Sequence, residues 1–311
     1  LGADIDLSDA DYSDGEGWVP IAIGDSFSGS FDGNGHMITG LKIDREDEDY
    51  QGLFASVAEA GVIRNVRLEI EEIHGNRYVG GLTAYNKGNI VNSSVSGGSI
   101  NGKVFVGGLA GIHSGNEIVR SSAAISVSGE NSIGGLVGFL KGLHPNTIKI
   151  SHSYATGEVT GDNEVGGLVG RIETANAGSL NEITNSYATG GVTGVDHVGG
   201  LVGNNFAYPS GETNIRNCYA TGDVIGDEQT GGLIGFNRTT GTLSEIKVAH
   251  CYVTGKVTSS TAKDIGGLIG QNDPDPDTII EVGQSYWNTD VYVDPGPDNE
   301  IGTPVTRVAL M

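Results

Sequence analysis

Hydrophobic residues and glycines recur along this chain in one four-residue phrase, an aliphatic residue or threonine followed by Gly-Gly-Leu. Seven copies occupy positions 79–82, 106–109, 133–136, 165–168, 198–201, 230–233 and 265–268, and Gly52-Leu53-Phe54 resembles a degenerate eighth. Gly52 aligns with the second glycine of each Gly-Gly-Leu. Starting from Gly52, this glycine recurs after 29, 27, 27, 32, 33, 32 and 35 residues. A repeat of this period is typical of a solenoid, in which each unit stacks on the next.

Between these copies lies a second phrase that aligns into columns of like residues. Positions 183–194 read Ile-Thr-Asn-Ser-Tyr-Ala-Thr-Gly-Gly-Val-Thr-Gly and are echoed at 150–161, 215–226 and 248–259. These segments are rich in Val, Ile, Thr and Tyr and lack helical periodicity, so each unit is predicted to hold several short strands. The alignment gives a polar column (Asn65, Asn92, Arg120, His152, Asn185, Asn217, His250, Gln284), a serine column (Ser93, Ser121, Ser153, Ser186, Cys218, Cys251, Ser285) and a tyrosine column (Tyr154, Tyr187, Tyr219, Tyr252, Tyr286).

The spacing between the two phrases predicts how the strands stack. From the polar column to the next Gly-Gly-Leu the chain keeps 15 to 17 residues, whereas from Gly-Gly-Leu to the following polar column the separation varies from 11 to 18 residues. In a parallel β-solenoid like residues lie one strand spacing apart, about 4.8 Å, so stacked arcs keep their length while one edge can extend. We therefore predict an all-β parallel β-solenoid (β-helix) of about eight coils.

Glycine accounts for 52 of the 311 residues and occupies fixed offsets in the repeat. We expect these glycines at corners that need a positive φ, or at core positions that leave no space for a Cβ. A flexible glycine-rich linker is excluded, because it would not carry Leu, Val and Ile in phase between the glycines.

The chain is strongly acidic, with a net charge of −22 and a pI of about 4.4. This charge repels polyanions and no basic cluster offsets it, so nucleic acid and anionic membrane surfaces are excluded as partners. No run approaches the roughly 18 consecutive apolar residues of a membrane span, so we expect no membrane insertion by this segment. We expect the chain to be a segment of a larger protein that begins inside a domain, so the missing secretory-leader pattern at its start is uninformative.

Cys218 and Cys251 are the two cysteines of the sequence and occupy the serine column in adjacent coils. Their Cα atoms should lie about 5 Å apart, within the range that permits a disulfide. Side chains in register on parallel strands point in the same direction rather than toward each other. We therefore expect two small buried residues that replace serine, with a disulfide as the alternative.

The first 50 residues differ from the repeats and carry the phrase Phe-Ser-Gly-Ser-Phe-Asp-Gly-Asn-Gly-His at positions 27–36. This phrase resembles the opening module of bacterial GLUG-repeat proteins, and the Gly-Leu-x-Gly cores at 135–138, 167–170, 200–203, 232–235 and 267–270 are similar to the motif that names them. Asp-Gly-Asn-Gly-His also resembles the first coil of pectate-lyase-like right-handed β-helices. The resemblance implies one continuous domain: a cap module over 1–50, a right-handed solenoid over 51–288 and an exit segment over 289–311.

GLUG repeats occur in large bacterial surface proteins, among them adhesins and immunoglobulin-A-cleaving zinc metallopeptidases in which the repeats are accessory. The resemblance therefore implies an extracellular or cell-surface location and a non-enzymatic structural or adhesive module. The alternatives are an accessory repeat domain of a secreted protease and a polysaccharide-acting β-helix enzyme, either a lyase or a glycoside hydrolase.

Candidate catalytic residues are few. A zinc protease of that class needs His-Glu-x-x-His, and none of the seven histidines is followed by Glu. His152 and His250 share the polar column about 14 Å apart, too far to hold one metal ion. Glu158 and Asp223 share an outward column near 10 Å apart, just outside the roughly 6.5–9.5 Å of an inverting glycosidase. We interpret both as solvated surface groups and predict no catalytic residues.

Acidic loops are the candidates for a metal site. Segment 9–16 has the carboxylates of a calcium loop, but its glycine is one position late for an EF-hand. Asp273, Asp275 and Asp277, and the similar segment 294–298, could hold Ca²⁺ through loosely arranged oxygens. Solvated acidic loops are the default interpretation, and Ca²⁺ is the cofactor that the composition suggests.

The edge of variable length is the best candidate for a binding surface. We expect segments 139–147, 171–182, 204–214, 236–247 and 271–281 to be loops that leave one corner of successive coils and form a loop ridge. On this loop ridge, exposed Phe206 and Tyr208 would stack on a glycan or contact a host or cell-surface protein. The polar residues expected to support them are Asn204, Asn205, Arg171, Asn237 and Arg238.

Overall fold

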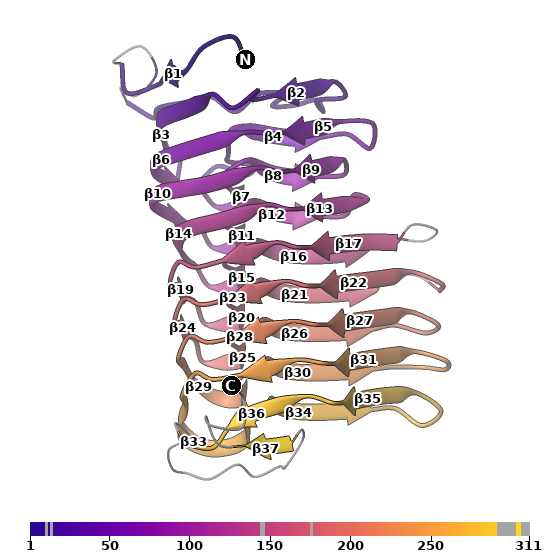
Figure 1. Ribbon diagram of the computed structural model, residues 1–311. Helices are drawn as coiled ribbons and strands as arrows, with labels where there is room; N and C mark the ends of the chain where they lie inside the picture. Colours follow the sequence, from indigo (N-terminus) through magenta and orange to yellow (C-terminus); the bar gives the residue numbers. More distant parts are fainter. Residues whose placement is uncertain (10–11, 13–14, 144–146, 175–176, 291–302, 306–311) are drawn as a thin grey trace.

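In the computed structural model, residues 1–9, 12, 15–143, 147–174, 177–290 and 303–305 are described. They form strands that wind into stacked coils along one axis (Figure 1). All pairings between named strands of the described residues are parallel, and they join each residue to its counterpart one coil away. The all-β parallel β-solenoid is therefore confirmed, and the right-handed winding stays a prediction.

Each coil contributes strands to three sheets. Sheet A has 20 strands: β1 (Ile5–Asp6), β3 (Met37–Asp44), β6 (Arg67–His74), β7 (Arg77–Gly80), β10 (Ser94–Asn101), β11 (Val104–Gly107), β14 (Ser122–Ser128), β15 (Asn131–Gly134), β18 (Tyr154–Ala155), β19 (Val159–Thr160), β20 (Asn163–Gly166), β23 (Tyr187–Ala188), β24 (Val192–Thr193), β25 (Asp196–Gly199), β28 (Tyr219–Ala220), β29 (Val224–Gly231), β32 (Tyr252–Val253), β33 (Val257–Gly266), β36 (Tyr286–Asn288) and β37 (Thr303–Val305).

The other two sheets are regular ladders with one strand from each coil. Sheet B has 8 strands: β4 (Phe54–Val57), β8 (Thr83–Asn86), β12 (Ala110–His113), β16 (Val137–Gly142), β21 (Val169–Thr174), β26 (Val202–Ala207), β30 (Ile234–Thr239) and β34 (Ile269–Pro274). Sheet C has 9 strands: β2 (Ser30–Asp32), β5 (Val62–Arg64), β9 (Asn89–Val91), β13 (Glu117–Val119), β17 (Thr147–Ser151), β22 (Leu180–Thr184), β27 (Glu212–Arg216), β31 (Glu245–Ala249) and β35 (Ile279–Gly283). The described stack therefore has about nine coils.

The N-terminal segment continues the stack, and a separate cap is not confirmed. β2 pairs with β5 and β3 pairs with β6, in parallel and in the order of the later coils. Residues 30–44 thus form the first coil, which adds one to the predicted number. At the other end β37 pairs with β36, while most of segment 289–311 lies outside the described residues.

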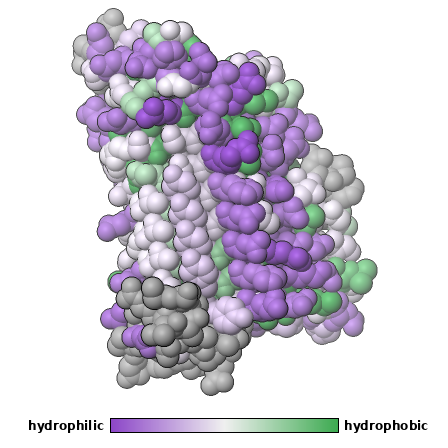
Figure 2. All heavy atoms as spheres, in the orientation of Figure 1, coloured by the Kyte–Doolittle hydropathy of each residue, from purple (hydrophilic) through white to green (hydrophobic). Residues whose placement is uncertain are grey.

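Columns of aliphatic side chains fill the interior. The leucines of the repeated phrase are fully buried: Leu82, Leu109, Leu136, Leu168, Leu201, Leu233 and Leu268. Valine and isoleucine from the preceding strand, such as Val165 and Val198, face the same interior. On the surface, side chains of similar hydropathy gather in stripes that run along the stacking axis (Figure 2). The register therefore sorts residue types by column both inside and outside the stack.

The repeated glycines are required by lack of space. A Cβ built on Gly167 would lie 2.2 Å from the carbonyl oxygen of Gly200 and 2.9 Å from the Cβ of Ala188. The alternative expectation, that these glycines sit at positive-φ corners, is wrong for the phrase, since neither Gly166 nor Gly167 has a positive φ. The corners are instead formed by other residue types, including the polar column. Close approach of successive coils is the reason for glycine at these positions.

The serine column is buried and bonded to the backbone. Each serine hydroxyl donates to the carbonyl two residues earlier, as Ser153 Oγ does to Ser151 at 2.9 Å. Cys218 and Cys251 are buried and form no disulfide. Their Sγ atoms point at the equivalent carbonyls, at 3.2 and 3.3 Å. The expectation that both cysteines are small buried residues in place of serine is confirmed.

Sheet B carries polar side chains into the interior. Asn205 Nδ2 donates to Asn237 Oδ1 at 3.0 Å, and Asn237 Nδ2 donates to Asn272 Oδ1 at 2.9 Å. The same column holds Asn86 and His113 nearer the N-terminus, where Asn86 Nδ2 donates to His113 Nδ1 at 2.9 Å. Asn86, Asn205 and Asn237 each donate to a counterpart one coil away, which lowers the cost of burying these amides. Asn205 Oδ1 and His113 Nε2 have no hydrogen-bond partner among the described residues.

We expect Gly167→Ala to lower the free energy of unfolding by about 3 kcal/mol, because the new Cβ would overlap the backbone of the next coil. Gly191 is the matched control, since a Cβ there would meet only the carbonyl oxygen of Asp223 at 3.8 Å. Urea unfolding of the two alanine variants measures the difference. Equal stability of Gly167→Ala and Gly191→Ala would contradict the steric explanation.

His113 should make stability depend on pH. Burial lowers the pKa of His113 to about 3, whereas an unfolded histidine titrates near 6.5. The contribution of neutral His113 to the free energy of unfolding is therefore fully present above about pH 6.5. It is lost as the pH falls toward 3, by on the order of 3–5 kcal/mol. In His113→Asn, which copies the neighbouring Asn86, this loss should be absent. Urea unfolding of the wild type and of His113→Asn at pH 7 and pH 4 measures this loss. The carboxylates titrate in both proteins, so only the difference between them reports on His113. An identical pH dependence of stability in the two proteins would refute the assignment to His113.

Candidate functional site

The polar column forms the corner between sheet C and sheet A, and Asn34 extends it into the first coil. All nine residues have a positive φ, between 46° and 56°. Asparagine and histidine adopt this left-handed conformation more readily than other side chains, whereas arginine does so at a cost of about 1–2 kcal/mol. Arg120 interrupts the asparagines of the first coils, and backbone strain of this kind gathers at functional sites.

Hydrogen bonds run along this corner from coil to coil. Asn92 Nδ2 donates to Asn65 Oδ1 at 2.8 Å, and Asn65 Nδ2 donates to Asp32 Oδ1 at 3.0 Å. The pKa of Asp32 lies below its ordinary value because Asn65 and the backbone N–H of Asn34 donate to its carboxylate. The asparagine side chains therefore have fixed orientations at the surface.

A groove of about 600 Å³ lies along the corner. It spans five successive coils and is open to solvent. Its lining residues are Asn34, Gly35, Asn65, Arg67, Asn92, Ser93, Ser94, Arg120, Ser122, His152 and Tyr154. We call this feature the polar groove.

The polar groove exists because the tyrosine column begins only at Tyr154. In the same register, the three preceding coils carry Ser122, Ser94 and Arg67. The serines leave open the volume that a ring fills in later coils. One face of Tyr154 stacks on Tyr187, with ring centroids 4.8 Å apart and planes at 1°. The opposite face borders the polar groove.

The tyrosine column beyond this point is a ladder of stacked rings. The centroids of Tyr187 and Tyr219 lie 4.6 Å apart, and those of Tyr219 and Tyr252 lie 4.9 Å apart. Desolvation raises the pKa of Tyr187 and of Tyr219, so both hydroxyls stay neutral at physiological pH. The ladder presents ring edges and hydroxyls to solvent, and Tyr154, at its N-terminal end, offers a ring face to the polar groove.

The polar groove is locally basic on an acidic protein. Arg67 and Arg120 line it and are exposed, and Arg120 forms no ion pair within the part of the chain that the structure describes. His152 adds an imidazole. No Asp or Glu occurs among the described residues that line the groove. The lining itself therefore presents no like charge to a negatively charged group, although the Asp32 carboxylate lies next to it on Asn65.

Sequence reasoning identified both columns but missed the groove between them. The signal was present in the alignment, because the position occupied by Tyr154 and Tyr187 is serine in the two coils before them. A change from small to large residues within one stacked column predicts a step in the surface.

The predicted loop ridge is largely strand. Segment 171–182 includes the end of β21 and the start of β22, and the strands of sheets B and C in the other coils meet along the same edge (Figure 1). Phe206 lies on β26 and is half-buried. Its ring contacts Tyr208 edge to face, with centroids 4.4 Å apart, and Arg238 lies 5.7 Å from its centroid. The two aromatics are thus together, Phe206 on β26 and Tyr208 just beyond its end, and they pack against each other rather than standing free on a loop.

The polar residues assigned to the loop ridge separate into two groups. Asn205 and Asn237 are fully buried in the interior column, so their expected place on the exposed surface is wrong. Arg171 pairs with Glu164 at 3.2 Å, and Asn204 Nδ2 donates to the same carboxylate at 2.8 Å. Arg238 pairs with Asp273 at 3.5 Å. These surface groups satisfy one another, and binding by them stays a prediction.

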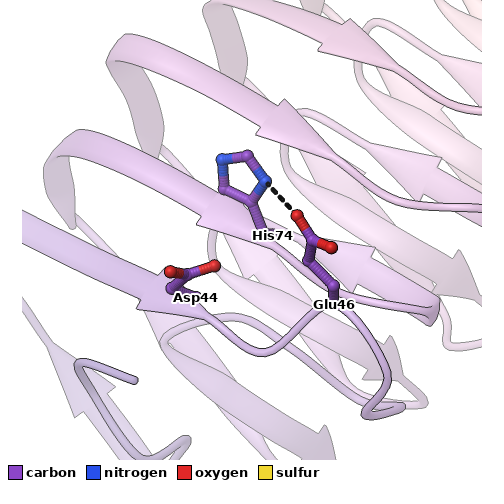
Figure 3. Close-up of side chains that lie close together, drawn as sticks. All are labelled: Asp44, Glu46 and His74. Carbon is purple, nitrogen blue, oxygen red and sulfur yellow. Dashed lines mark ion pairs between the residues drawn. The ribbon is translucent and has the colours of Figure 1, made fainter. Parts of the chain in front are cut away.

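The candidate calcium residues do not gather. Asp275 Oδ2 accepts from the backbone N–H of Gly241 at 3.0 Å, Asp273 faces Arg238, and Asp277 has a positive φ of 67°. Segment 294–298 and residues 10, 11, 13 and 14 of the acidic loop at 9–16 lie outside the described residues. The described side chains do bring one histidine and two carboxylates together elsewhere, at Asp44, Glu46 and His74 (Figure 3).

Comparisons with known proteins identify the repeat. Residues 194–225 match the family model of the GLUG motif. Halomucin of Haloquadratum walsbyi is 38% identical over 104 residues, which are 31% of this chain and 1% of that protein. A Gly-rich membrane protein of Evansella cellulosilytica is 43% identical over 98 residues, which are 30% of this chain and 11% of that protein. No solved structure matches the chain.

The matched regions are small parts of much longer relatives, since the chain spans 1% and 11% of their lengths. No helix among the described residues is long and apolar enough to cross a membrane. The in-phase Gly-Gly-Leu copies, the parallel coils and the motif match agree with one another. The chain therefore carries a GLUG motif at residues 194–225, within a repeat that winds as a parallel β-solenoid.

Proposed function

We propose that this chain is a non-enzymatic adhesive module of a cell-surface or secreted protein, and that its polar groove binds an extended acidic glycan. The observation that carries the proposal is the groove itself, where a free ring face of Tyr154 meets hydrogen-bonding side chains from five successive coils. The surface location is supported by a relative that is named a membrane protein.

The geometry of the polar groove favours a polymer over a small molecule. Ligand sites combine an aromatic or apolar surface with a few polar groups that fix the orientation of the ligand. In the polar groove Tyr154 supplies the aromatic surface, and the polar groups come from Asn65, Asn92 and Arg120. The members of the polar column recur every 4.8 Å or so, and five coils span about 19 Å. A chain of repeating sugar units would meet a repeating set of contacts.

The charge of the polar groove favours an acidic glycan. Arg67 and Arg120 are its charged lining residues, with no carboxylate beside them in the lining. The net charge of −22 opposes anions at long range, but physiological salt screens interactions between exposed charges beyond about 8 Å. A uronic acid polymer, with carboxylates spaced one per sugar, can satisfy the two guanidinium groups locally.

The same lining supports a non-enzymatic role. Glycoside hydrolysis needs two positioned carboxyl groups, and base-catalysed elimination needs a base within hydrogen-bond reach. The described lining of the polar groove supplies neither Asp nor Glu, so it lacks the carboxyl pair of a hydrolase, and His152 is left as the candidate base for an elimination. Glu158 and Asp223 lie in another column, where backbone bonds place them two coils apart with Gly191 between them, or about 10 Å. We interpret them as solvated surface groups.

We expect polygalacturonate to bind this protein more tightly than a neutral glucan in titration calorimetry, with an affinity that falls as salt is added. Tyr154→Ala and Arg120→Gln should each weaken binding about tenfold or more, as loss of a central anchor does. Ser122→Tyr is the sharpest variant, because it extends the tyrosine ladder by one ring and fills the groove while leaving the other contacts in place. It should abolish binding.

The double variant Phe206→Ala/Tyr208→Ala is the matched control and should bind as the wild type does. Thermal melts of every variant test that the fold is kept. Loss of binding in the double variant but not in Ser122→Tyr would move the site to the loop ridge. Equal binding of the charged and neutral polymers, or binding only to proteins on an array, would refute the proposal of an acidic glycan.

We expect no release of product from pectin, alginate, glucans or immunoglobulin A, with or without added Ca²⁺ or Zn²⁺, because no acid pair faces the polar groove. Reducing-sugar and peptide-release assays on the purified protein measure this. Turnover that disappears in Glu158→Gln or Asp223→Asn would establish a polysaccharide-acting enzyme instead.

A further inference from the structure

A histidine and two carboxylates converge at the end of the first two coils, away from the polar groove. Asp44 is the last residue of β3 and His74 is the last residue of β6, and the two are register partners. Glu46 follows in the turn after β3 (Figure 3). One ligand atom from each of the three residues lies within 4.8 Å of the others, and His74 Nδ1 lies 3.8 Å from Glu46 Oε1.

The second nitrogen of the imidazole also has a partner. His74 Nε2 lies 3.5 Å from Glu72 Oε2, and Glu72 is held in turn by Lys42 Nζ at 3.1 Å. Histidines that bind metals through one ring nitrogen usually donate the other N–H to a carboxylate, which fixes the ring orientation and the tautomer. Glu72 is placed to do this for a metal on the Nδ1 side.

We propose that Asp44, Glu46 and His74 bind a divalent transition-metal ion, with Zn²⁺ the best match, and that Glu72 is a positioning residue for His74. Imidazole with carboxylates is a donor set suited to Zn²⁺, whereas Ca²⁺ and Mg²⁺ prefer oxygen donors alone. Two of the ligands are set by strand register, and the third lies on a turn that can close the site. Water would complete the coordination.

The surroundings attract cations. Segment 44–49 reads Asp-Arg-Glu-Asp-Glu-Asp, and its arginine is engaged by Glu16 and Glu48 at 2.7 and 3.3 Å. Asp44 and Glu46 are exposed and His74 is half-buried, so the site is open to ions from solvent. Because β6 begins at Arg67 in the polar groove and ends at His74, about 23 Å separates the two sites and each can be tested without the other.

Titration calorimetry of the full chain with ZnCl₂ tests the proposal. We expect one saturable site per chain, lost in His74→Gln and weakened at least tenfold in Asp44→Asn and Glu46→Gln. Glu72→Gln should weaken binding about 10- to 100-fold, as substitutions behind a metal-bound histidine do. Zn²⁺ should also raise the melting temperature of the wild type and leave that of His74→Gln unchanged.

His36→Gln is the matched control, because within the described part of the chain His36 pairs with a single carboxylate, that of Asp4 at 3.1 Å from Nδ1; the variant should bind Zn²⁺ as the wild type does. Imidazole signals in NMR spectra should shift on titration for His74 and not for His36. Absence of saturable binding in the wild type at millimolar Zn²⁺, equal binding in His74→Gln, or full displacement of Zn²⁺ by equimolar Ca²⁺ would each overturn the proposal.

Discussion

In-register pairing of parallel strands is the constraint on which the rest of this molecule depends. Each residue lies about 4.8 Å from its counterpart in the next coil, so a side chain must be compatible with a copy of itself or with what replaces it. That spacing leaves no space for a Cβ at Gly167, stacks tyrosine rings 4.6 to 4.9 Å apart and brings Asn205 into hydrogen-bonding range of Asn237. Residue types that pair well with themselves are therefore repeated column by column.

The fold could be predicted from the sequence because residues that stack in one column recur at the same position of each repeat. Glycine, leucine, serine and tyrosine recur in phase, and the structure places each set in one column. The burial of Asn205 could not be predicted in this way, since an asparagine in a segment of variable length ordinarily indicates an exposed loop. Only the amide ladder makes a buried site favourable, and that ladder requires neighbours of equal strand length, as β26, β30 and β34 have.

The polar groove was harder to predict for the opposite reason. It arises where two neighbouring coils differ, with Ser122 in one and Tyr154 in the next. Aligning the repeats to find positions that share a residue type does not draw attention to positions where the residue type changes. The metal-site candidate likewise depends on a non-repeating turn at Glu46 beside one register pair, Asp44 and His74. In a solenoid the repeat specifies the scaffold, and departures from the repeat create its individual sites.

The direction of the bonds between coils has a mechanical consequence. These hydrogen bonds run along the stacking axis, so a pulling force applied along that axis acts directly on them, and few bonds share the load at the edge of a detaching coil. The rod should then yield by peeling one coil at a time rather than by shearing as a unit. With 27 to 35 residues from one copy of the phrase to the next, each step would release about 90–120 Å of extended chain, which makes the module a graded extensible tether.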